Sequence, residues 1–457
     1  MNFKQAIEQI GGLKYIVGLL NIRSSAGRKF LLSLPFLTQK DELEKIFDES
    51  ELLFAKWNDD NTRRAFSVLE TKLSQLRDIS STLRHLKERN VMDDVELFEI
   101  KHFALLSNAI REIKEEMELT YFRIPDLLQV IDILDPEQKR IPHFYIYDQY
   151  SSELTELRKK INQATLSDKE TILFETEKLE NNIRREISEK LRPHAKTMQQ
   201  VLSELARLDV ELAKTEQVVT LSLSKPDFSS ENTEIKEMFH PQVAFALSQQ
   251  GKAFQKIDID IPTQPTLITG ANMAGKSVLL KTVALIQTMA QFGFYVPAAS
   301  AKIVPVEKIF ISAGDGQDEM NGLSSFASEM LRINEMISAI KKGTKALVLI
   351  DELARTTNPT EGKAIVCGML DFLIENGVRS LITTHYSIHL PCRKLRVKGF
   401  IESKSNEKID SKNINNYIDY SLEETTDNEV PHEAIKIAEI IGVDDDILER
   451  TKKYLKK

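Results

Sequence analysis

The chain has 17 glycines among its 457 residues, and none of them lies between Gly27 and Gly251. An average glycine content of about 7% would place about 15 in that stretch. The stretch is also poor in proline and rich in leucine, glutamate, lysine and arginine, a composition that favours helices over turns and strands. We therefore predict an all-helical part over residues 1–225. A second architecture, with glycines between β-rich runs, is expected over 226–430.

Apolar residues recur at spacings of three and four along the glycine-free stretch, as in helices with one buried face. We expect two helices within Met1–Leu34, followed by helices over 41–57, 62–89 and 93–119. After a break around Pro125, Pro136 and Pro142, three apolar stripes follow: Leu154, Leu157 and Ile161; Leu179, Ile183, Ile187 and Leu191; and Val201, Leu205, Leu208 and Leu212. The last spacing is typical of an antiparallel coiled coil. We interpret all three stripes as packing between helices.

Charge and cysteine content limit the class of protein. The net charge is −8 and the pI is about 5.7, so bulk charge does not favour nucleic acid as a partner. No apolar run approaches the roughly 20 residues of a membrane span, and no secretory leader is evident. Cys367 and Cys392 are the only cysteines, which excludes a disulfide scaffold and a cysteine-rich zinc site. We expect a cytoplasmic protein with no membrane partner.

The segment Gly270–Ser277 matches the phosphate-binding pattern G-x-x-x-x-G-K-[ST] at every fixed position. An apolar strand is expected before it, over Pro265–Thr269, and a helix after it, over 278–292. In this context backbone N–H groups and the helix N-terminus surround phosphate oxygens. Lys276 would neutralise the β- and γ-phosphates of ATP, and the Ser277 hydroxyl would bind Mg²⁺. The expected nucleotide contacts are Gly270, Ala271, Asn272, Met273, Ala274, Gly275, Lys276, Ser277 and Val278.

Two further strands end in side chains that suit the same chemistry. The apolar run over 345–350 is followed by Asp351 and Glu352, and the carboxyl ends of parallel strands are where α/β proteins bind ligands. Asp351 is expected to hold Mg²⁺, and Glu352 to polarise the attacking water. The run over 380–384 ends at His385, which we interpret as a sensor of the γ-phosphate. Alone, a histidine of this kind is more often a structural residue.

These residues resemble the ATPase domain of the MutS mismatch-repair family. The resemblance lies in the segments 270–277, 295–298, 323–330, 351–362 and 383–386. Segments 314–317 and 358–362 are most similar to the second bacterial MutS branch, whose members usually end in an Smr nuclease domain. The segments 24–28 and 76–79 resemble that branch's helical core. Residues 433–453 resemble the closing helical dimerisation motif, so we expect a dimerisation segment over 431–457.

The resemblance implies roles for four more residues. Asn272 would contact the γ-phosphate, and Gln317 would couple the nucleotide state to the helical part. Phe254 would stack on adenine, although a core aromatic residue is an equally good interpretation. Ser324 would reach the ATP of a partner subunit, which implies a homodimer with composite sites. A helix N-cap is the alternative for Ser324.

The sequence departs from the family pattern in ways that bear on its target. The mismatch-reading domain and the Smr domain are not recognised. Segments 151–163 and 197–218 resemble the two lever helices that carry a DNA clamp in the family, but only about thirty residues separate them. That connection is acidic rather than basic, whereas phosphate contacts require lysine and arginine. Ala354 also stands where the family motif has glycine.

Two classes of function follow. The first is a MutS-like ATPase in which ATP binding closes a dimer and moves the lever on DNA, in a role related to mismatch repair. The second uses the same closure to remodel a protein client, as in short MutS-like chains that resemble reactivating factors of adenosylcobalamin-dependent aminomutases. A nucleotide-bound scaffold without turnover is a third possibility and requires Glu352 to be idle.

Overall fold

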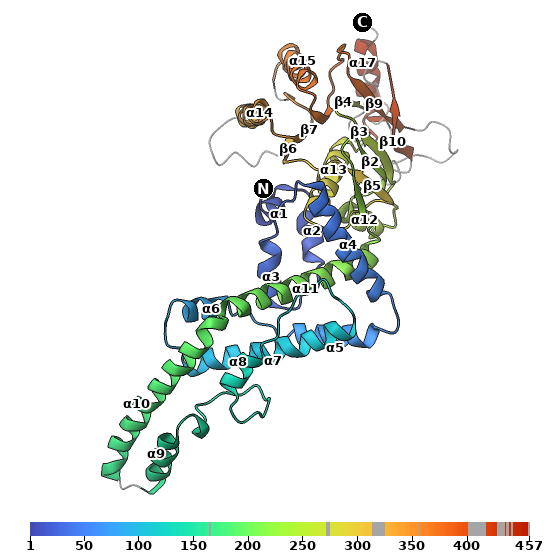
Figure 1. Cartoon of the computed structure of the whole chain (residues 1–457). Helices are drawn as coiled ribbons and strands as arrows, with labels where there is room; N and C mark the ends of the chain where they lie inside the picture. Colours follow the sequence, from blue (N-terminus) through green and yellow to red (C-terminus); the bar gives the residue numbers. More distant parts are fainter. Residues whose placement is uncertain are drawn as a thin grey trace. The chain divides into compact units, whose positions relative to one another are not determined.

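The structure is a computed structural model that describes residues 1–163, 166–270, 275–312, 325–355, 357–400, 417–426, 435, 438–439 and 442–455. Its contacts divide the chain into two compact units (Figure 1). The first comprises Met1–Leu19, Pro35–Phe47 and Gln217–Lys457, and the second comprises Leu20–Leu34 and Asp48–Glu216. We expected one helical part over 1–225. The structure instead groups the first helices with the α/β part.

Aromatic packing explains why the N-terminal helices belong to the first unit. Helices α1 (Phe3–Gln9) and α2 (Leu13–Gly18) begin the chain. The ring of Phe3 stacks on Phe294 with the centroids 5.7 Å apart, and it meets Phe292 edge-on at 4.8 Å. The Gln291 side-chain amide donates a 2.6 Å hydrogen bond to the carbonyl of Leu37. These contacts join both N-terminal segments to the helix that ends at Gln291.

Two sheets form the centre of the first unit. The smaller one has the order β1-β5-β2-β3, formed by Pro226–Phe228, Ser300–Ile303, Thr233–Met238 and Ile257–Ile261. Helix α12 (Pro241–Ser248) lies between β2 and β3 in the chain. The larger sheet has the order β10-β9-β4-β8-β7-β6, formed by Ile418–Glu424, Arg393–Phe400, Pro265–Thr269, Arg379–Thr383, Ala346–Ile350 and Lys308–Ser312.

The larger sheet is parallel from β9 to β6, and β10 pairs with β9 in the antiparallel sense. The strands predicted before the phosphate-binding pattern and before Asp351 are confirmed as β4 and β7, and both are buried along their whole length. The remaining helices of this unit are α13 (Lys276–Gln291), α14 (Ser325–Lys341), α15 (Pro359–Glu375) and α17 (Asp445–Leu455). Side chains of α14 and α15 share one apolar core with β4, β7 and β8.

The second unit is a helical bundle. Its elements are α3 (Ser25–Leu32), the second part of α4 (Lys40–Trp57), α5 (Arg63–Leu73), α6 (Ser80–Lys87), α7 (Asp94–Glu116), α8 (Leu128–Leu134), η1 (Asp148–Tyr150), α9 (Ser152–Gln163), α10 (Leu166–Leu191), η2 (Arg192–His194) and most of α11 (Ala195–Leu221). Their apolar stripes meet in one continuous core. In the part of the chain that the structure describes, no helix is long and apolar enough to cross a membrane.

Two of the helix predictions were wrong in their division. Residues 1–34 form three helices instead of two. The single helix expected over 62–89 is two helices, α5 and α6, with a break at 74–79. The Asp78 carboxylate accepts a 3.0 Å hydrogen bond from the backbone N–H of Ser80 and thereby starts a new helix. Apolar spacing does not detect such a local polar contact.

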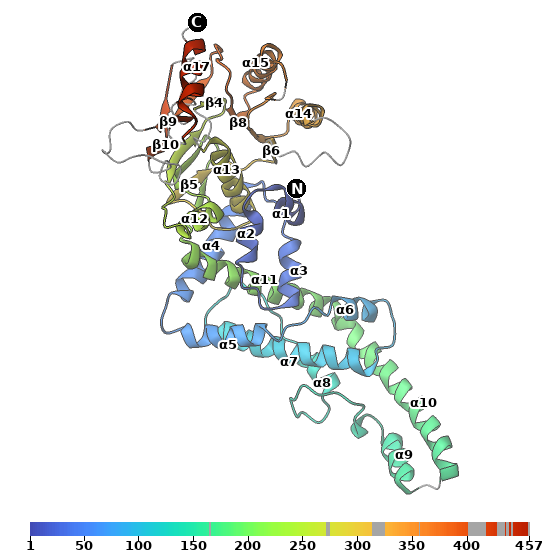
Figure 2. The ribbon, with the colours of Figure 1, turned by 180° about the vertical axis from the view of Figure 1, so that it is seen from behind.

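The acidic connection predicted between the lever helices is itself a helix. Its acidic residues lie on α10, which is separated from α9 only by 164–165 and continues through η2 into α11. Helices α9 and α10 run side by side in both views (Figure 1 and Figure 2). Among the described residues between 151 and 221, no strand occurs. The returning arm therefore starts at Leu166, about thirty residues earlier than we expected.

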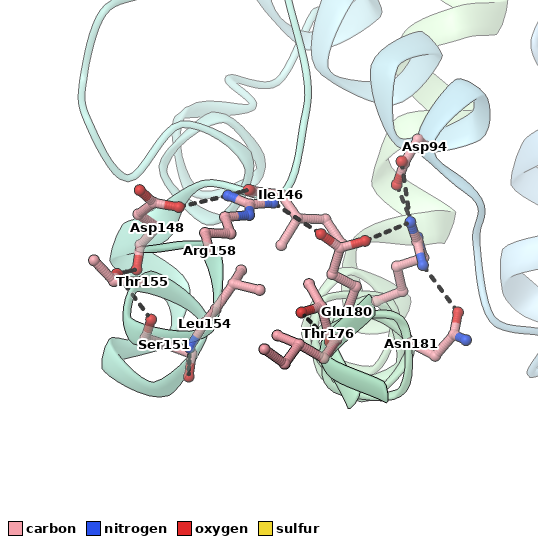
Figure 3. Close-up of polar contacts among 12 residues, drawn as sticks. Asp94, Ile146, Asp148, Ser151, Leu154, Thr155, Arg158, Thr176, Glu180 and Asn181 are labelled. Atoms are coloured by element: carbon pink, nitrogen blue, oxygen red, sulfur yellow. Dashed lines mark hydrogen bonds and ion pairs between the residues drawn. The ribbon is translucent and has the colours of Figure 1, made fainter. Parts of the chain in front are cut away.

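Arginine–carboxylate contacts fix the base of this hairpin (Figure 3). Arg158 donates to the carbonyl of Ile146 at 2.8 Å and to Glu180 at 2.9 Å. Arg184 makes a two-pronged contact with Asp94, at 2.8 and 3.1 Å. Planar pairs of this kind hold their partners in one geometry. The hairpin is therefore joined to α7 and to the segment before α9.

Candidate active site

Three neighbouring parallel strands deliver the candidate residues to one edge of the larger sheet. Strand β4 lies next to β8, and β8 lies next to β7. Gly270 follows β4 directly, Asp351 follows β7 directly, and His385 stands two residues after β8. Because the carboxyl ends of parallel strands lie at the same edge, residues from distant parts of the sequence meet there.

The glycines of the phosphate-binding pattern occupy backbone conformations that other residues avoid. Gly270 has φ 148° and Gly275 has φ 73°, and Gly275 is the N-cap of α13. A left-handed residue at this point turns the chain sharply into the helix. The residues between them, Ala271, Asn272, Met273 and Ala274, lie outside the described residues. Gln317 and Ser324 also lie outside them, so their expected roles stay predictions.

Lys276 is buried at the start of α13, only 5% exposed. Its ammonium donates a 2.6 Å hydrogen bond to the carbonyl of Gly270, across the loop. Burial lowers the pKa of Lys276, and the charges of Glu352 and Asp351 partly oppose that shift. The lysine is therefore near both carboxylates and is largely removed from water. Ser277 is exposed and Val278 is half-buried on the same first turn.

A threonine that we did not single out connects the ends of β7 and β8. Thr383 Oγ1 donates a 2.6 Å hydrogen bond to Asp351 Oδ1 and accepts one of 2.9 Å from the backbone N–H of Glu352. His385 Nε2 contacts Glu352 Oε1, and Arg355 donates to the other carboxylate oxygen at 2.8 Å. The expected catalytic glutamate and the expected sensor histidine are thus in direct contact. Thr383 lay in a predicted strand and in segment 383–386 of the family resemblance, but neither pattern indicated this role for its hydroxyl.

The turn after the two carboxylates has an unusual backbone. Glu352 and Ala354 have φ angles of 51° and 57°, a left-handed conformation that costs a side-chain-bearing residue roughly 1–2 kcal/mol. Ala354 is the position at which the resembled motif has glycine, the residue best suited to this conformation. The backbone N–H of Ala354 donates to Glu329 at 3.3 Å, and its carbonyl accepts from the Tyr386 hydroxyl at 3.2 Å. These contacts stabilise the turn that presents Glu352.

A cavity of about 450 Å³ lies beside the first turn of α13. Phe254, Gly275 and Val278 line it, and so do Ile418 and Tyr420 from β10. The Gln255 side chain accepts a 3.1 Å hydrogen bond from the backbone N–H of Tyr420 and donates one of 2.7 Å to Asp419. The cavity is mostly apolar and adjoins the phosphate-binding segment. Tyr420 was missed because it follows a long stretch of sequence without any motif.

The geometry fits a magnesium–nucleotide complex. Hydroxyl and carboxylate oxygens, as in Ser277 and Asp351, are the donors that Mg²⁺ accepts. The two glycines with positive φ, the buried lysine and the start of a helix are groups that suit phosphate oxygens. A planar ring could enter the neighbouring cavity. The residues present therefore match the groups of ATP and one divalent cation.

The fold and the site define an α/β domain whose functional groups gather at the carboxyl edge of a parallel sheet, after an N-terminal helical region. Comparison with known families makes the assignment specific. Residues 266–457 match the family model MutS domain V. This part of the chain is therefore a MutS domain V, as the resemblance predicted.

Curated relatives of two names match the chain. The DNA mismatch repair protein MutS of Thermotoga neapolitana is 35% identical over 237 residues, 51% of this chain and 28% of that protein. The Endonuclease MutS2 of Thermus thermophilus is 35% identical over 207 residues, 45% of this chain and 26% of that protein. The Endonuclease MutS2 of Caldanaerobacter subterraneus subsp. tengcongensis is 29% identical over 316 residues, 68% of this chain and 38% of that protein. The chain thus matches between 26% and 38% of the length of these relatives.

Proposed function

We propose that this protein binds and hydrolyses Mg²⁺-ATP at the carboxyl edge of the larger sheet. The observation that supports this most directly is a connected group of side chains. Thr383 bonds to Asp351 and Glu352, and Glu352 contacts His385. The buried ammonium of Lys276 lies near both carboxylates. Lysine and two carboxylates at this edge can bind phosphate, hold Mg²⁺ and orient water. The match of residues 266–457 to MutS domain V agrees with this activity.

In this proposal each residue has a defined task. Lys276 binds the β- and γ-phosphates, and Ser277 and Asp351 hold Mg²⁺, which neutralises phosphate charge. Glu352 orients the attacking water, and its two oxygens must then leave His385 and Arg355. His385 detects the γ-phosphate through its contact with Glu352. Phe254 and Tyr420 enclose the base in the apolar cavity.

We also infer a homodimer in which ATP closes two composite sites. Support comes from the family assignment, and from the resemblance of 323–330 to a loop that reaches the partner's nucleotide. The C-terminal segment, of which α17 is described, would hold the two subunits together. Sedimentation with and without ATP tests this assembly.

The experiment that tests the activity is phosphate release by the purified full chain with Mg²⁺ or with a chelator. We expect hydrolysis only with Mg²⁺. Lys276→Ala should weaken ATP binding in a calorimetric titration, whereas the exposed Lys302→Ala should not, although it removes the same charge. Unchanged affinity in the Lys276 variant, or equal hydrolysis in chelator, would contradict the proposal.

For the target of the cycle, the names of the relatives support a DNA-repair-related role. In this proposal the helical unit moves on duplex or branched DNA when ATP binds. ATPase rates with and without such DNA, titrated against salt, test it. Stimulation by DNA supports this role, and no affinity at low salt with ATP present contradicts it.

A specific observation favours a protein client as the second candidate. At the end of the α9–α10 hairpin, where a DNA clamp would be inserted, Leu173 and Phe174 are 53% and 71% exposed. Glu170 and Glu177 lie one helical turn before and after them. The exposed apolar side chains suit contact with a protein surface. The carboxylates beside them repel a phosphate backbone. An ATPase rate that DNA does not stimulate would favour this candidate.

A further inference from the structure

The segment Leu76-Arg77-Asp78-Ile79, which resembles the family's helical core, contains one residue without a structural partner. Leu76 and Ile79 are buried in the core of the helical unit. Asp78 pairs with Lys29 at 2.8 Å and starts α6. Arg77 is exposed, and it forms no ion pair or hydrogen bond with any described residue. Packing and the contacts of Asp78 therefore explain three of these residues but leave the arginine unexplained.

Arg77 lines a cavity of about 240 Å³ between the break at 74–79 and the first half of α7. The other charged or titratable residues in its lining are His102 and Glu99. Leu76, Ile79, Phe98, Phe103 and Leu106 provide an apolar floor. The rings of Phe98 and His102 stack, with their centroids 6.0 Å apart. The cavity thus combines an aromatic surface with a cation at its margin.

Two cations, Arg77 in the lining and Lys72 nearby, act on the cavity. Burial lowers the pKa of His102, and the nearby charges of Arg77 and Lys72 lower it further. Lys72 also forms no ion pair among the described residues. The acidic neighbours are already engaged, since Asp78 pairs with Lys29 and Glu99 accepts a 2.6 Å hydrogen bond from the Thr82 hydroxyl. Arg77 in the lining and Lys72 nearby outnumber Glu99, the carboxylate of the lining, so an anion would be attracted to the cavity.

We propose that this cavity binds a nucleotide unit, with its phosphate at Arg77 and its base on the Phe98 and His102 rings. An arginine fork matches phosphate oxygens, and aromatic rings accept the flat face of any base. A bare phosphate would leave the apolar floor uncovered. The same chemistry is offered by a free mononucleotide and by one residue of single-stranded DNA. The inference goes beyond the proposed function, because the cavity belongs to the helical unit and needs no ATP.

The test is a titration of the full chain, with isotope-labelled histidines, followed by NMR at the His102 ring. The probes are thymidine 5′-monophosphate, thymidine, inorganic phosphate and a single-stranded oligothymidylate. We expect the monophosphate to shift the His102 signal and to raise the pKa of His102, because a bound anion stabilises the imidazolium. Thymidine and phosphate alone should each bind at least tenfold more weakly. Arg77→Gln should weaken binding of the monophosphate at least tenfold, and Arg64→Gln on α5 is the matched control.

Each outcome bears on the proposal. Binding of both the monophosphate and the oligonucleotide supports a strand residue, and binding of the monophosphate alone supports a free nucleotide. No shift of His102 with any probe, equal affinity for inorganic phosphate, or unchanged affinity in Arg77→Gln would overturn the site. Basal ATP hydrolysis should be the same in Arg77→Gln and in the unmodified chain. If the unmodified chain hydrolyses no ATP, the ATPase proposal is contradicted, but binding of the monophosphate at this cavity is not affected.

Discussion

The hydroxyl of Thr383 donates a 2.6 Å hydrogen bond to the carboxylate of Asp351, from the end of one strand to the end of its neighbour. The same oxygen accepts from the N–H of Glu352, and Thr383 is fully buried. One hydroxyl therefore fixes the orientation of the proposed metal ligand and of the backbone that carries the proposed catalytic glutamate. This relationship makes Thr383 a positioning residue of the site.

Replacing Thr383 with valine keeps the shape of the side chain and removes the hydroxyl. We expect ATP hydrolysis to fall about 10- to 100-fold, with a higher Mg²⁺ concentration at half-maximal rate, because outer contacts of this kind orient a metal ligand. Thr383→Ser retains the hydroxyl and should keep most of the activity. Phosphate release measured across a Mg²⁺ titration checks this. Equal rates in both variants would show that the hydroxyl has no role.

Glu352→Gln should abolish turnover while nucleotide still binds. An amide cannot accept the proton of the attacking water, and general-base catalysis contributes about 10²- to 10⁴-fold. We expect a long-lived ATP-bound dimer, detectable by sedimentation. Single-turnover phosphate release should be slowed by at least about 10²-fold. Normal turnover in this variant would remove Glu352 from the mechanism.

The apolar cavity beside α13 predicts a role for Tyr420 in binding the base. Tyr420→Ala should weaken ATP binding roughly tenfold or more, since loss of one stacking contact costs about 1–3 kcal/mol. Tyr420→Phe keeps the ring, and the Gln255 contact to the backbone is unaffected. Its affinity should therefore stay near that of the unmodified chain. Calorimetry with ATP decides, and equal affinities in all three proteins would place the base elsewhere.

Gly27 predicts a stability effect far from the nucleotide site. A side chain at this buried position would overlap the Asp209 carboxylate, which accepts hydrogen bonds from Ser24 at 2.8 and 2.5 Å. Gly27→Ala should destabilise the helical unit by about 1–3 kcal/mol, as overpacking does. Gly368→Ala, inside α15 with open space around it, should stabilise by about 0.5–1 kcal/mol. Thermal unfolding of both variants tests the contrast.

A buried ion pair in the helical core predicts a further loss of stability. The Lys101 ammonium lies 3.0 Å from Asp135, and both side chains are fully buried. Lys101→Ala leaves a buried charge without its partner, which typically costs about 3–5 kcal/mol. The double variant Lys101→Met/Asp135→Leu should recover much of that. Urea unfolding compares the three proteins, and a single variant as stable as the parent would refute the assignment.

The same pair implies a pH dependence. Burial raises the pKa of Asp135, but hydrogen bonds from the Arg140 N–H and from Lys101, together with their charges, outweigh it and lower the pKa below the ordinary value. The stabilisation is therefore complete above the ordinary carboxyl pKa and is lost as the pH falls through the lower folded-state value. In the double variant, this part of the acid sensitivity should disappear.

Local sequence patterns predicted much of the fold. Strands β4 and β7 were expected because short apolar runs preceded motif residues, and the helical stripes through Ile183, Ile187 and Leu191 are buried as predicted. The break at 74–79 and the start of the returning arm at Leu166 were not predicted. The break depends on one side-chain contact of Asp78. The start at Leu166 depends on whether the acidic segment is a helix or a loop, which acidic composition does not decide.

The sequence by itself determined which residues carry the proposed chemistry, through a phosphate-binding pattern and two carboxylates after an apolar strand. It also determined the helical region, through a long stretch with no glycine. Those features depend on residue type and spacing along the chain. The tertiary structure decided which side chains meet. Thr383 joins Asp351 and Glu352, and Tyr420 completes a cavity with Phe254. Arg77, which pairs with no described residue, borders a second cavity. These arrangements arise because strand order and helix packing bring together residues that are distant in the sequence.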